Sequence, residues 1–155
     1  MKNIVIVALL SVFVVAPAVA AGEAGQFYAG AKLSDGLGVF GGYTIDQNFA
    51  AEAEYTDLGS SGYYKSSAIG VSGVYSHPIK QQVSLIGKLG IARAASDYAY
   101  LGTTYTRTNT SLSFSIGAQY AFNPQAAVQA GFQSYSLASG VGTADSIYVA
   151  GVYKF

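Results

Sequence analysis

The sequence predicts an all-β protein, an eight-stranded antiparallel up-and-down transmembrane β-barrel. Only 10% of the 155 residues are charged, whereas soluble domains average about 25%. The chain is also rich in Gly, Tyr and Phe, with 19, 13 and 8 residues. No apolar run in residues 21–155 reaches the roughly 18 residues that a membrane helix needs. Short segments of alternating hydrophobicity separated by turn residues are instead typical of a membrane barrel.

The first twenty residues have the pattern of a secretory signal peptide. Lys2 supplies the positive charge, Ile4 to Ala16 an apolar stretch, and Ala18-Val19-Ala20 a small-residue cleavage site. The apolar stretch is too short for a transmembrane helix. We therefore expect residues 1–20 to be a signal peptide and residues 21–155 to form one barrel domain.

Four predicted strands end in a tyrosine and then meet a turn or the end of the sequence. They are Gly38–Tyr43, Gly70–Tyr75, Ile116–Tyr120 and Ala150–Tyr153. Turn residues follow the first three, at 46–48, 77–81 and 123–125. We expect these strands to descend to the periplasmic side, where their tyrosines would form an aromatic girdle at the membrane interface.

Four ascending strands fit between the descending ones. They are Gln26–Leu33, Phe49–Leu58, Val83–Ala95 and Ala126–Ser136. The connections on the outer side would then be the tight turn 34–36 and three loops, Gly59–Lys65, Asp97–Thr108 and Leu137–Ala144. Eight strands give the even number that single-chain bacterial barrels have.

The distribution of charge predicts which face of each strand meets lipid. The outward set carries no charge, whereas the inward set holds Lys32, Glu52, Glu54, Lys88 and Lys154. Shifting a strand by one residue would place its charges in lipid, at about 2–4 kcal/mol for a basic side chain near the midplane. Lys32, Glu52, Glu54 and Lys88 are therefore expected near mid-height in the lumen. They would form either a closed, ion-paired plug or a gated ion path.

The sequence offers little for catalysis or metal binding. His77 is the sole histidine and there is no cysteine. We expect His77 to be an interfacial turn residue and the protein not to be an enzyme, with no catalytic residues, metal site or cofactor. A contact surface is the other candidate site, because Tyr98, Tyr100, Tyr105 and Arg107 fall in the loop Asp97–Thr108 and such residues favour binding hot spots.

The last strand, Ile147–Phe155, ends on an aromatic residue with Tyr153 two positions earlier. Gly151, Tyr153 and Phe155 together resemble the C-terminal assembly signal of bacterial outer-membrane barrels. This resemblance implies an integral protein of the Gram-negative outer membrane, exported by its signal peptide. The expected partners are the barrel-assembly machinery, outer-membrane lipid and lipopolysaccharide, but not nucleic acid, and we expect a monomer.

The chain also resembles the transmembrane domain of the OmpA family and, more broadly, the small OmpA/OmpX-type barrels. The resemblance is carried by residues 27–33, 39–43, 51–59, 78–79, 88–90 and 151–155. It implies an eight-stranded barrel with an interior charge cluster, in which Glu52 matches the family's inward glutamate of strand three. The inward partners of that glutamate fall on Val74, Gln119 and Gln129 here. The expected function is a structural or surface role, in membrane integrity or adhesion; the alternative is a narrow nonspecific pore gated by the interior charges.

Overall fold

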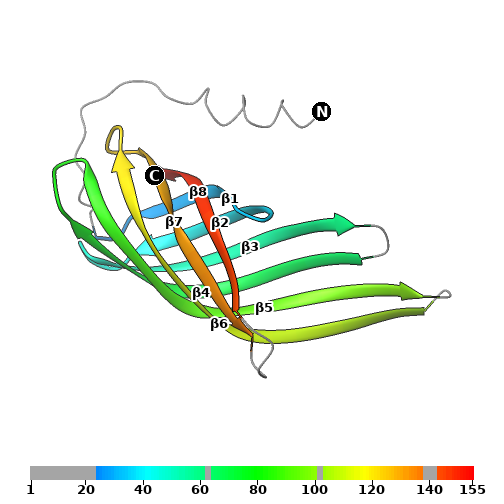
Figure 1. Ribbon diagram of the computed structural model, residues 1–155. Coiled ribbons are helices and arrows are strands. Elements are labelled where there is room, and N and C mark those ends of the chain that lie inside the picture. Colours follow the sequence, from blue (N-terminus) through cyan, green and yellow to red (C-terminus); the bar gives the residue numbers. More distant parts are fainter. Residues whose placement is uncertain (1–23, 62–63, 101–102, 138–142) are drawn as a thin grey trace, which may run out of the picture.

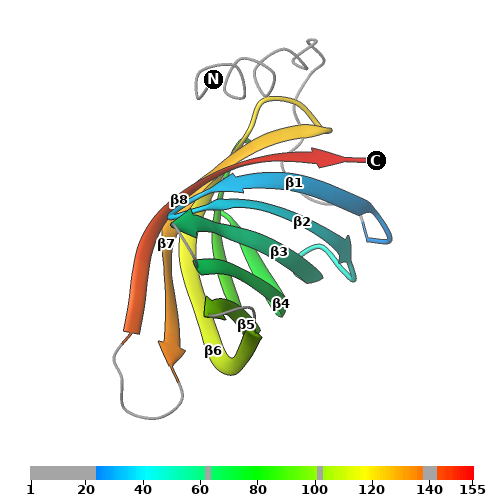
Figure 2. The same cartoon turned by 90° about the vertical axis from the view of Figure 1, so that its right-hand side faces the viewer.

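A computed structural model of the chain is a closed barrel of eight antiparallel strands (Figure 1). The strands are β1 (Phe27–Leu33), β2 (Leu37–Thr44), β3 (Phe49–Ser61), β4 (Tyr64–Pro78), β5 (Val83–Tyr100), β6 (Thr103–Ala121), β7 (Ala126–Leu137) and β8 (Thr143–Lys154). Each strand pairs with its sequence neighbours, and β8 pairs with β1 to close the wall (Figure 2). The predicted fold class, strand number and strand order are confirmed.

The structure describes residues 24–61, 64–100, 103–137 and 143–155. For residues 58–61, 64–66, 96–100, 103–107, 136–137 and 143–144 it describes the backbone alone. The predicted signal peptide, residues 1–20, lies outside these ranges. Within them, no helix is long and apolar enough to cross a membrane.

The predicted register is the one observed. The large outward side chains of the wall are exposed, among them Val39, Val71, Leu89, Ile91, Ile116 and Val149. The residues between them point into the lumen and are buried, among them Phe40, Ser84, Ile86, Gln119 and Tyr148. Successive side chains of a strand alternate between its two faces. A wall that is apolar outside and mixed inside therefore follows directly from the two-residue period.

Short turns hold one end of the barrel, which we call the lower end. Asp46 Oδ1 accepts hydrogen bonds from the backbone N–H groups of Asn48 and Phe49, at 2.7 and 2.8 Å. Asn123 Oδ1 accepts in the same way from Gln125 and Ala126, at 2.9 and 2.6 Å. Asp and Asn side chains that bond the backbone two or three residues ahead stabilise tight turns. Asp46 and Asn123 thus stabilise the turns after β2 and after β6.

An aromatic rim surrounds the lower end on its outer side. The four predicted tyrosines, Tyr43, Tyr75, Tyr120 and Tyr153, all face outward and are exposed. Each has a phenylalanine ring beside it, with centroids 4.9 Å apart for Phe27–Tyr43, 5.0 Å for Phe49–Tyr75, 5.2 Å for Tyr120–Phe122 and 5.3 Å for Tyr153–Phe155. Rings at this level form the interfacial girdle of a membrane barrel.

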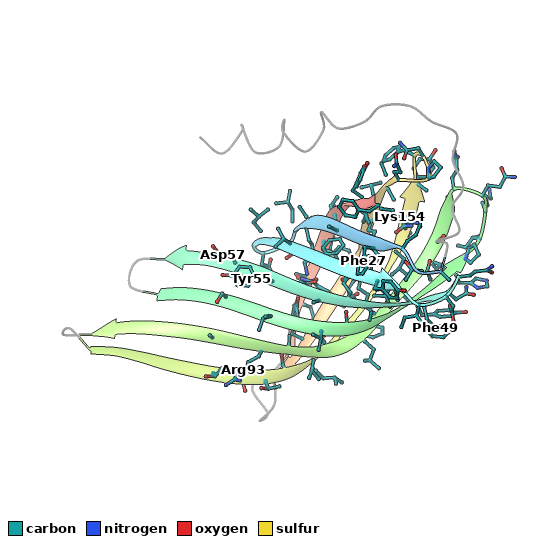
Figure 3. All side chains as sticks on the ribbon, turned by 180° about the vertical axis from the view of Figure 1, so that it is seen from behind. Phe27, Phe49, Tyr55, Asp57, Arg93 and Lys154 are labelled. Atoms are coloured by element: carbon teal, nitrogen blue, oxygen red, sulfur yellow. The ribbon has the colours of Figure 1, made fainter. Side chains whose placement is uncertain are left out.

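Outward-facing charges mark the opposite, upper limit of the apolar belt. Asp57 on β3, Arg93 on β5 and Asp145 on β8 are exposed on the outer face. Figure 3 shows Phe49 and Asp57 toward opposite ends of β3. Eight positions separate them on that strand, a rise of about 27 Å along the strand and about 20 Å of height at the usual tilt. That height is close to an outer-membrane apolar band.

Four strands continue well beyond this upper limit. β3, β4, β5 and β6 extend past the β1–β2 hairpin as a sheet (Figure 1), and pairing between β5 and β6 runs unbroken to Tyr100↔Thr103. We call the part above Asp57 and Arg93 the projecting sheet: residues 58–61, 64–66, 94–100 and 103–109. The prediction of loops at Gly59–Lys65 and Asp97–Thr108 was therefore wrong. Polar, β-branched residues no longer alternate with apolar ones there, and the two-residue pattern used to find strands disappears above the membrane.

Candidate functional site: the charged interior

Four charged side chains from three strands meet inside the barrel. Lys32 comes from β1, Glu52 and Glu54 from β3, and Lys88 from β5. Glu52 and Glu54 are two residues apart, so both point into the lumen. The structure brings together all four residues that the sequence predicted for this cluster, as two ion pairs.

The first ion pair joins Glu52 to Lys88. Lys88 Nζ donates to Glu52 Oε1 at 2.6 Å, and the Tyr28 hydroxyl donates to Glu52 Oε2 at 3.0 Å. Both carboxylate oxygens are thereby used, and the Glu52 side chain is almost fully buried. A buried carboxylate is tolerated only when it is paired and hydrogen-bonded in this way.

The second ion pair joins Lys32 to Glu54. Lys32 Nζ also donates to Gln133 Oε1 at 2.9 Å, and Gln133 Nε2 donates to Ser146 Oγ at 3.0 Å. Glu54 Oε1 further accepts from Thr56 Oγ1 at 3.0 Å and from the Tyr135 hydroxyl at 3.4 Å. The network therefore links side chains of β1, β3, β7 and β8 inside the lumen.

Two aromatic rings lie close to the lysine ammonium groups. Lys88 Nζ lies 4.8 Å from the centroid of the Phe40 ring and 6.0 Å from that of Tyr148. Lys32 Nζ lies 6.0 Å from the same Tyr148 ring, which is only 2% exposed. The negative ring face attracts each ammonium group. The Tyr148 ring is thus within cation–π range of both lysines.

Small cavities lie above and below this layer of ion pairs. The lower cavity, of about 60 Å³, is lined by Ile86, Gln119, Gln129 and Lys154 among others. Above the pairs lies a cavity of about 140 Å³. A neighbouring one of about 40 Å³ has Glu54 and Lys88 in its wall and shares Ala92, Gln133 and Tyr135 with the larger cavity. A water molecule needs roughly 10–15 Å³ of such space. The lumen has room for water on both sides, and the Glu52–Lys88 pair with Tyr148 lies between the two regions.

The sequence matches a family model for the outer membrane protein beta-barrel domain over residues 5–155. The chain belongs to this family of outer-membrane β-barrel proteins. A comparison with curated protein sequences found no match.

Solved structures of outer-membrane barrels share the fold. The N-terminal β-barrel domain of Pseudomonas aeruginosa OprF superimposes with a TM-score of 0.68 at 12% identity, covering 84% of this chain and 96% of that one. Neisserial surface protein A gives 0.62 at 16% identity, with 84% and 95% covered. Ail, the attachment invasion locus protein of Yersinia pestis, gives 0.58 at 18% identity, with 84% and 94% covered. The family match and these shared folds support a location in the outer membrane.

The predicted assembly signal lies on the strand that closes this outer-membrane barrel. β8 pairs with β1 at Ala29↔Tyr153 and Ala31↔Gly151, and the backbone N–H of Phe155 donates to Phe27 O at 2.9 Å. Across this pair the backbones approach closely: a Cβ on Gly30 would lie 2.4 Å from the Gly151 carbonyl oxygen. The placement is as predicted, and recognition of these residues by the assembly machinery stays a prediction.

The predicted contact residues are not in a loop. Tyr98 and Tyr100 belong to β5, Tyr105 and Arg107 to β6, and Tyr98 pairs directly with Tyr105. Their side chains lie outside the described part of the structure. His77, expected in a turn, is instead near the end of β4, where it pairs with Leu85 and its ring stacks on Tyr75 at 6.5 Å. Among the described residues, no group of His, Cys, Asp and Glu could hold a metal ion.

Sequence reasoning missed part of the polar network. Thr56 was not considered an interior residue, although it follows Glu52 and Glu54 at the same two-residue spacing and is 2% exposed. Tyr28, Gln133 and Tyr135 lie at inward positions of the two-residue pattern, but the sequence does not identify them as partners of the charges. The two-residue pattern of β3 that includes Glu52 and Glu54 continues to Thr56, so it could have identified Thr56 as an interior residue. The hydrogen-bond partners of Glu52 and Glu54 depend instead on which strands come close together inside the barrel.

Proposed function

We propose that this protein acts at the bacterial surface, as an outer-membrane barrel that carries a contact element into the exterior. It is exported by its signal peptide, folded by the barrel-assembly machinery and held as a monomer in a Gram-negative outer membrane containing lipopolysaccharide. The observation that carries the proposal is the projecting sheet, in which β5 and β6 stay paired seven positions above Arg93, as far as Tyr100. Paired backbone makes this an ordered platform rather than a loose loop.

Two further features support a surface role. The lumen is filled at mid-height by ion pairs and aromatic rings, so the barrel serves as an anchor for what lies above it. One protein of the same fold is named for attachment and invasion. Ail and the present chain share the barrel fold, and we extend the attachment role to this chain.

Shortening the β5–β6 hairpin tests this function. Ser96 and Arg107 are paired across the hairpin, so residues 97–106 can be replaced by Asn-Gly, which forms a two-residue turn between paired strands. Cells displaying this variant should lose attachment to host cells or matrix protein. Heat-dependent gel mobility of the purified variant should remain, because the barrel below is unchanged. Attachment equal to wild type would contradict the proposal.

A narrow pore is the second candidate. It is favoured by the arrangement of the cavities, since a single layer containing Glu52, Lys88 and Tyr148 lies between the upper and lower spaces. Rearrangement of that ion pair would join them into one aqueous path. Planar-bilayer recordings of the refolded protein test the idea. Discrete conductance steps that change in Glu52→Gln would support it, and a silent bilayer would remove it.

A further inference from the structure

The upper end of the lumen contains a cavity of about 140 Å³ that the ion pairs do not fill. Its wall combines the turn residues Ser34 and Asp35, between β1 and β2, with inward residues of β3 to β8. The β1–β2 hairpin is shorter than its neighbours (Figure 1), so its turn lies at the mouth of the lumen. A cavity of about 150 Å³ holds one benzene molecule. The space above the ion pairs therefore fits a ligand of about six heavy atoms.

Three hydroxyl groups in this wall already donate their hydrogen to other atoms. Thr56 Oγ1 and the Tyr135 hydroxyl donate to Glu54 Oε1, at 3.0 and 3.4 Å. Ser111 Oγ donates to the backbone oxygen of Ala92 at 3.3 Å. Carboxylate and carbonyl oxygens only accept hydrogen bonds, so each hydroxyl is the donor and keeps its lone pairs. These three groups therefore offer hydrogen-bond acceptors to a ligand in the cavity.

Asp35 gives the same wall a negative charge. Its side chain is exposed, and no basic side chain among the residues that the structure describes forms an ion pair with it. Lys32, which lies below the cavity, is already paired with Glu54 and donates to Gln133. Arg93 is on the outer face of the barrel wall. The charge of the wall therefore favours a positively charged ligand over a neutral or negative one.

Another part of the wall is apolar and consists of small side chains. Ala68 and Ala94 are paired across β4 and β5, and Ala92 lies one inward position below Ala94. Side chains no larger than a methyl group at these positions leave the cavity open. They also give a short alkyl chain an apolar surface to pack against.

We infer that this cavity, which we call the upper pocket, binds a primary alkylammonium group that enters from the outer side of the barrel. An ammonium group carries three N–H donors, no acceptor and one positive charge, and so complements the three hydroxyl acceptors and Asp35. The alkyl chain next to it packs against the three alanines. A free amine and a lysine side chain of another protein share this chemistry. The inference goes beyond the proposed surface function, because none of residues 97–106 lines the pocket.

The test uses the mature chain in lipid nanodiscs and n-butylammonium as the probe, with binding followed by NMR. Saturable shifts should appear at Asp35, Ala92 and Tyr135, and binding should weaken as salt screens the charge. n-Butanol and butyrate carry an alkyl chain of similar length without the ammonium group, and neither should cause saturable shifts at these residues. No saturable shift with butylammonium, or an equal effect of butanol, would overturn the inference.

Substitutions separate the charge of the pocket from its shape. Asp35→Asn removes the charge from an exposed turn, so the barrel should still fold and the Kd of butylammonium should rise about tenfold or more. Ala92→Leu fills the cavity and should abolish binding, with heat-dependent gel mobility to confirm that the barrel is folded. Asp46→Asn is the matched control, because it removes a charge from a lower turn and its amide oxygen can still accept from Asn48 and Phe49. An unchanged Kd in Asp35→Asn, or an equal rise in the control, would overturn the inference.

A blocked peptide with one lysine, acetyl-Gly-Lys-Gly-amide, identifies the source of the ammonium group. Binding of this peptide with the same dependence on Asp35 would indicate a protein partner, whereas binding of butylammonium alone would indicate a free amine; both outcomes support the upper pocket. The variant in which Asn-Gly replaces residues 97–106 should bind butylammonium like wild type. If it does so and also attaches to cells like wild type, the proposed function fails and the upper pocket stands. If it no longer binds butylammonium, the upper pocket is overturned.

Discussion

Tyr28 and Gly42 are paired across β1 and β2, and the Tyr28 ring occupies the space that a side chain at Gly42 would fill. A Cβ on Gly42 would lie 2.2 Å from Tyr28 Cζ. The ring covers the glycine, and its hydroxyl donates to Glu52. Because Gly42 has no side chain, the Tyr28 ring of β1 can lie over β2 and donate a hydrogen bond to Glu52 of β3.

Gly42→Ala should therefore destabilise the barrel. The added methyl displaces the Tyr28 ring and removes one hydrogen bond from buried Glu52, and overpacking of this kind costs about 1–3 kcal/mol. Equilibrium unfolding in urea with lipid vesicles measures the change. Gly87→Ala is the matched control, because a Cβ there meets nothing within 4 Å, and its free energy of unfolding should equal that of wild type. Equal stability of both variants would show that the Tyr28 ring relaxes freely.

The Glu52–Lys88 pair predicts a strongly non-additive pair of substitutions. Glu52→Gln leaves a buried ammonium group without its counter-charge, and Lys88→Met leaves a buried carboxylate, so each should cost about 3–5 kcal/mol. The double variant removes both charges and should cost much less than the sum of the two. A double-mutant cycle in the same unfolding assay gives the coupling energy. Strict additivity would mean that the 2.6 Å contact contributes nothing.

The sequence predicted the register because lipid and lumen impose opposite demands on alternate residues. Only one register keeps charge out of lipid, and in it four charged residues face inward: Lys32, Glu52, Glu54 and Lys88. The sequence did not predict which acid meets which base, because Lys32 and Glu54 lie on strands separated by β2, and their side chains meet over Gly38 of that strand. It also missed the upper parts of β5 and β6. Above Arg93 the strands leave the apolar belt, so lipid no longer imposes an alternation, although the threonines between Thr103 and Thr110 favour a strand.

The observed register predicts how position on the outer wall controls the cost of a charge. Leu89 faces lipid midway between the aromatic rim and Arg93, and it is 59% exposed. Leu89→Arg should destabilise the barrel by about 2–4 kcal/mol, whereas Thr110→Arg, beside Arg93 at the upper limit, should cost about 0–1 kcal/mol. Unfolding in lipid vesicles measures both. A similar cost at the two positions would contradict the assignment of the membrane belt.

A substitution at the end of β8 should slow assembly of the barrel in cells and leave its stability almost unchanged. Phe155 is 71% exposed and its ring centroid lies 5.3 Å from that of Tyr153, so Phe155→Ala should change the free energy of unfolding in vesicles by less than about 1 kcal/mol. In cells the same change should slow insertion, because the predicted signal for the assembly machinery is damaged. Phe122→Ala is the matched control: its ring lies on the same rim, 5.2 Å from Tyr120, but on the turn after β6. Pulse-chase measurement of folded barrel should show a delay for Phe155→Ala alone. Equal delays for the two variants would mean that assembly responds to rim aromatics in general and not to the closing strand.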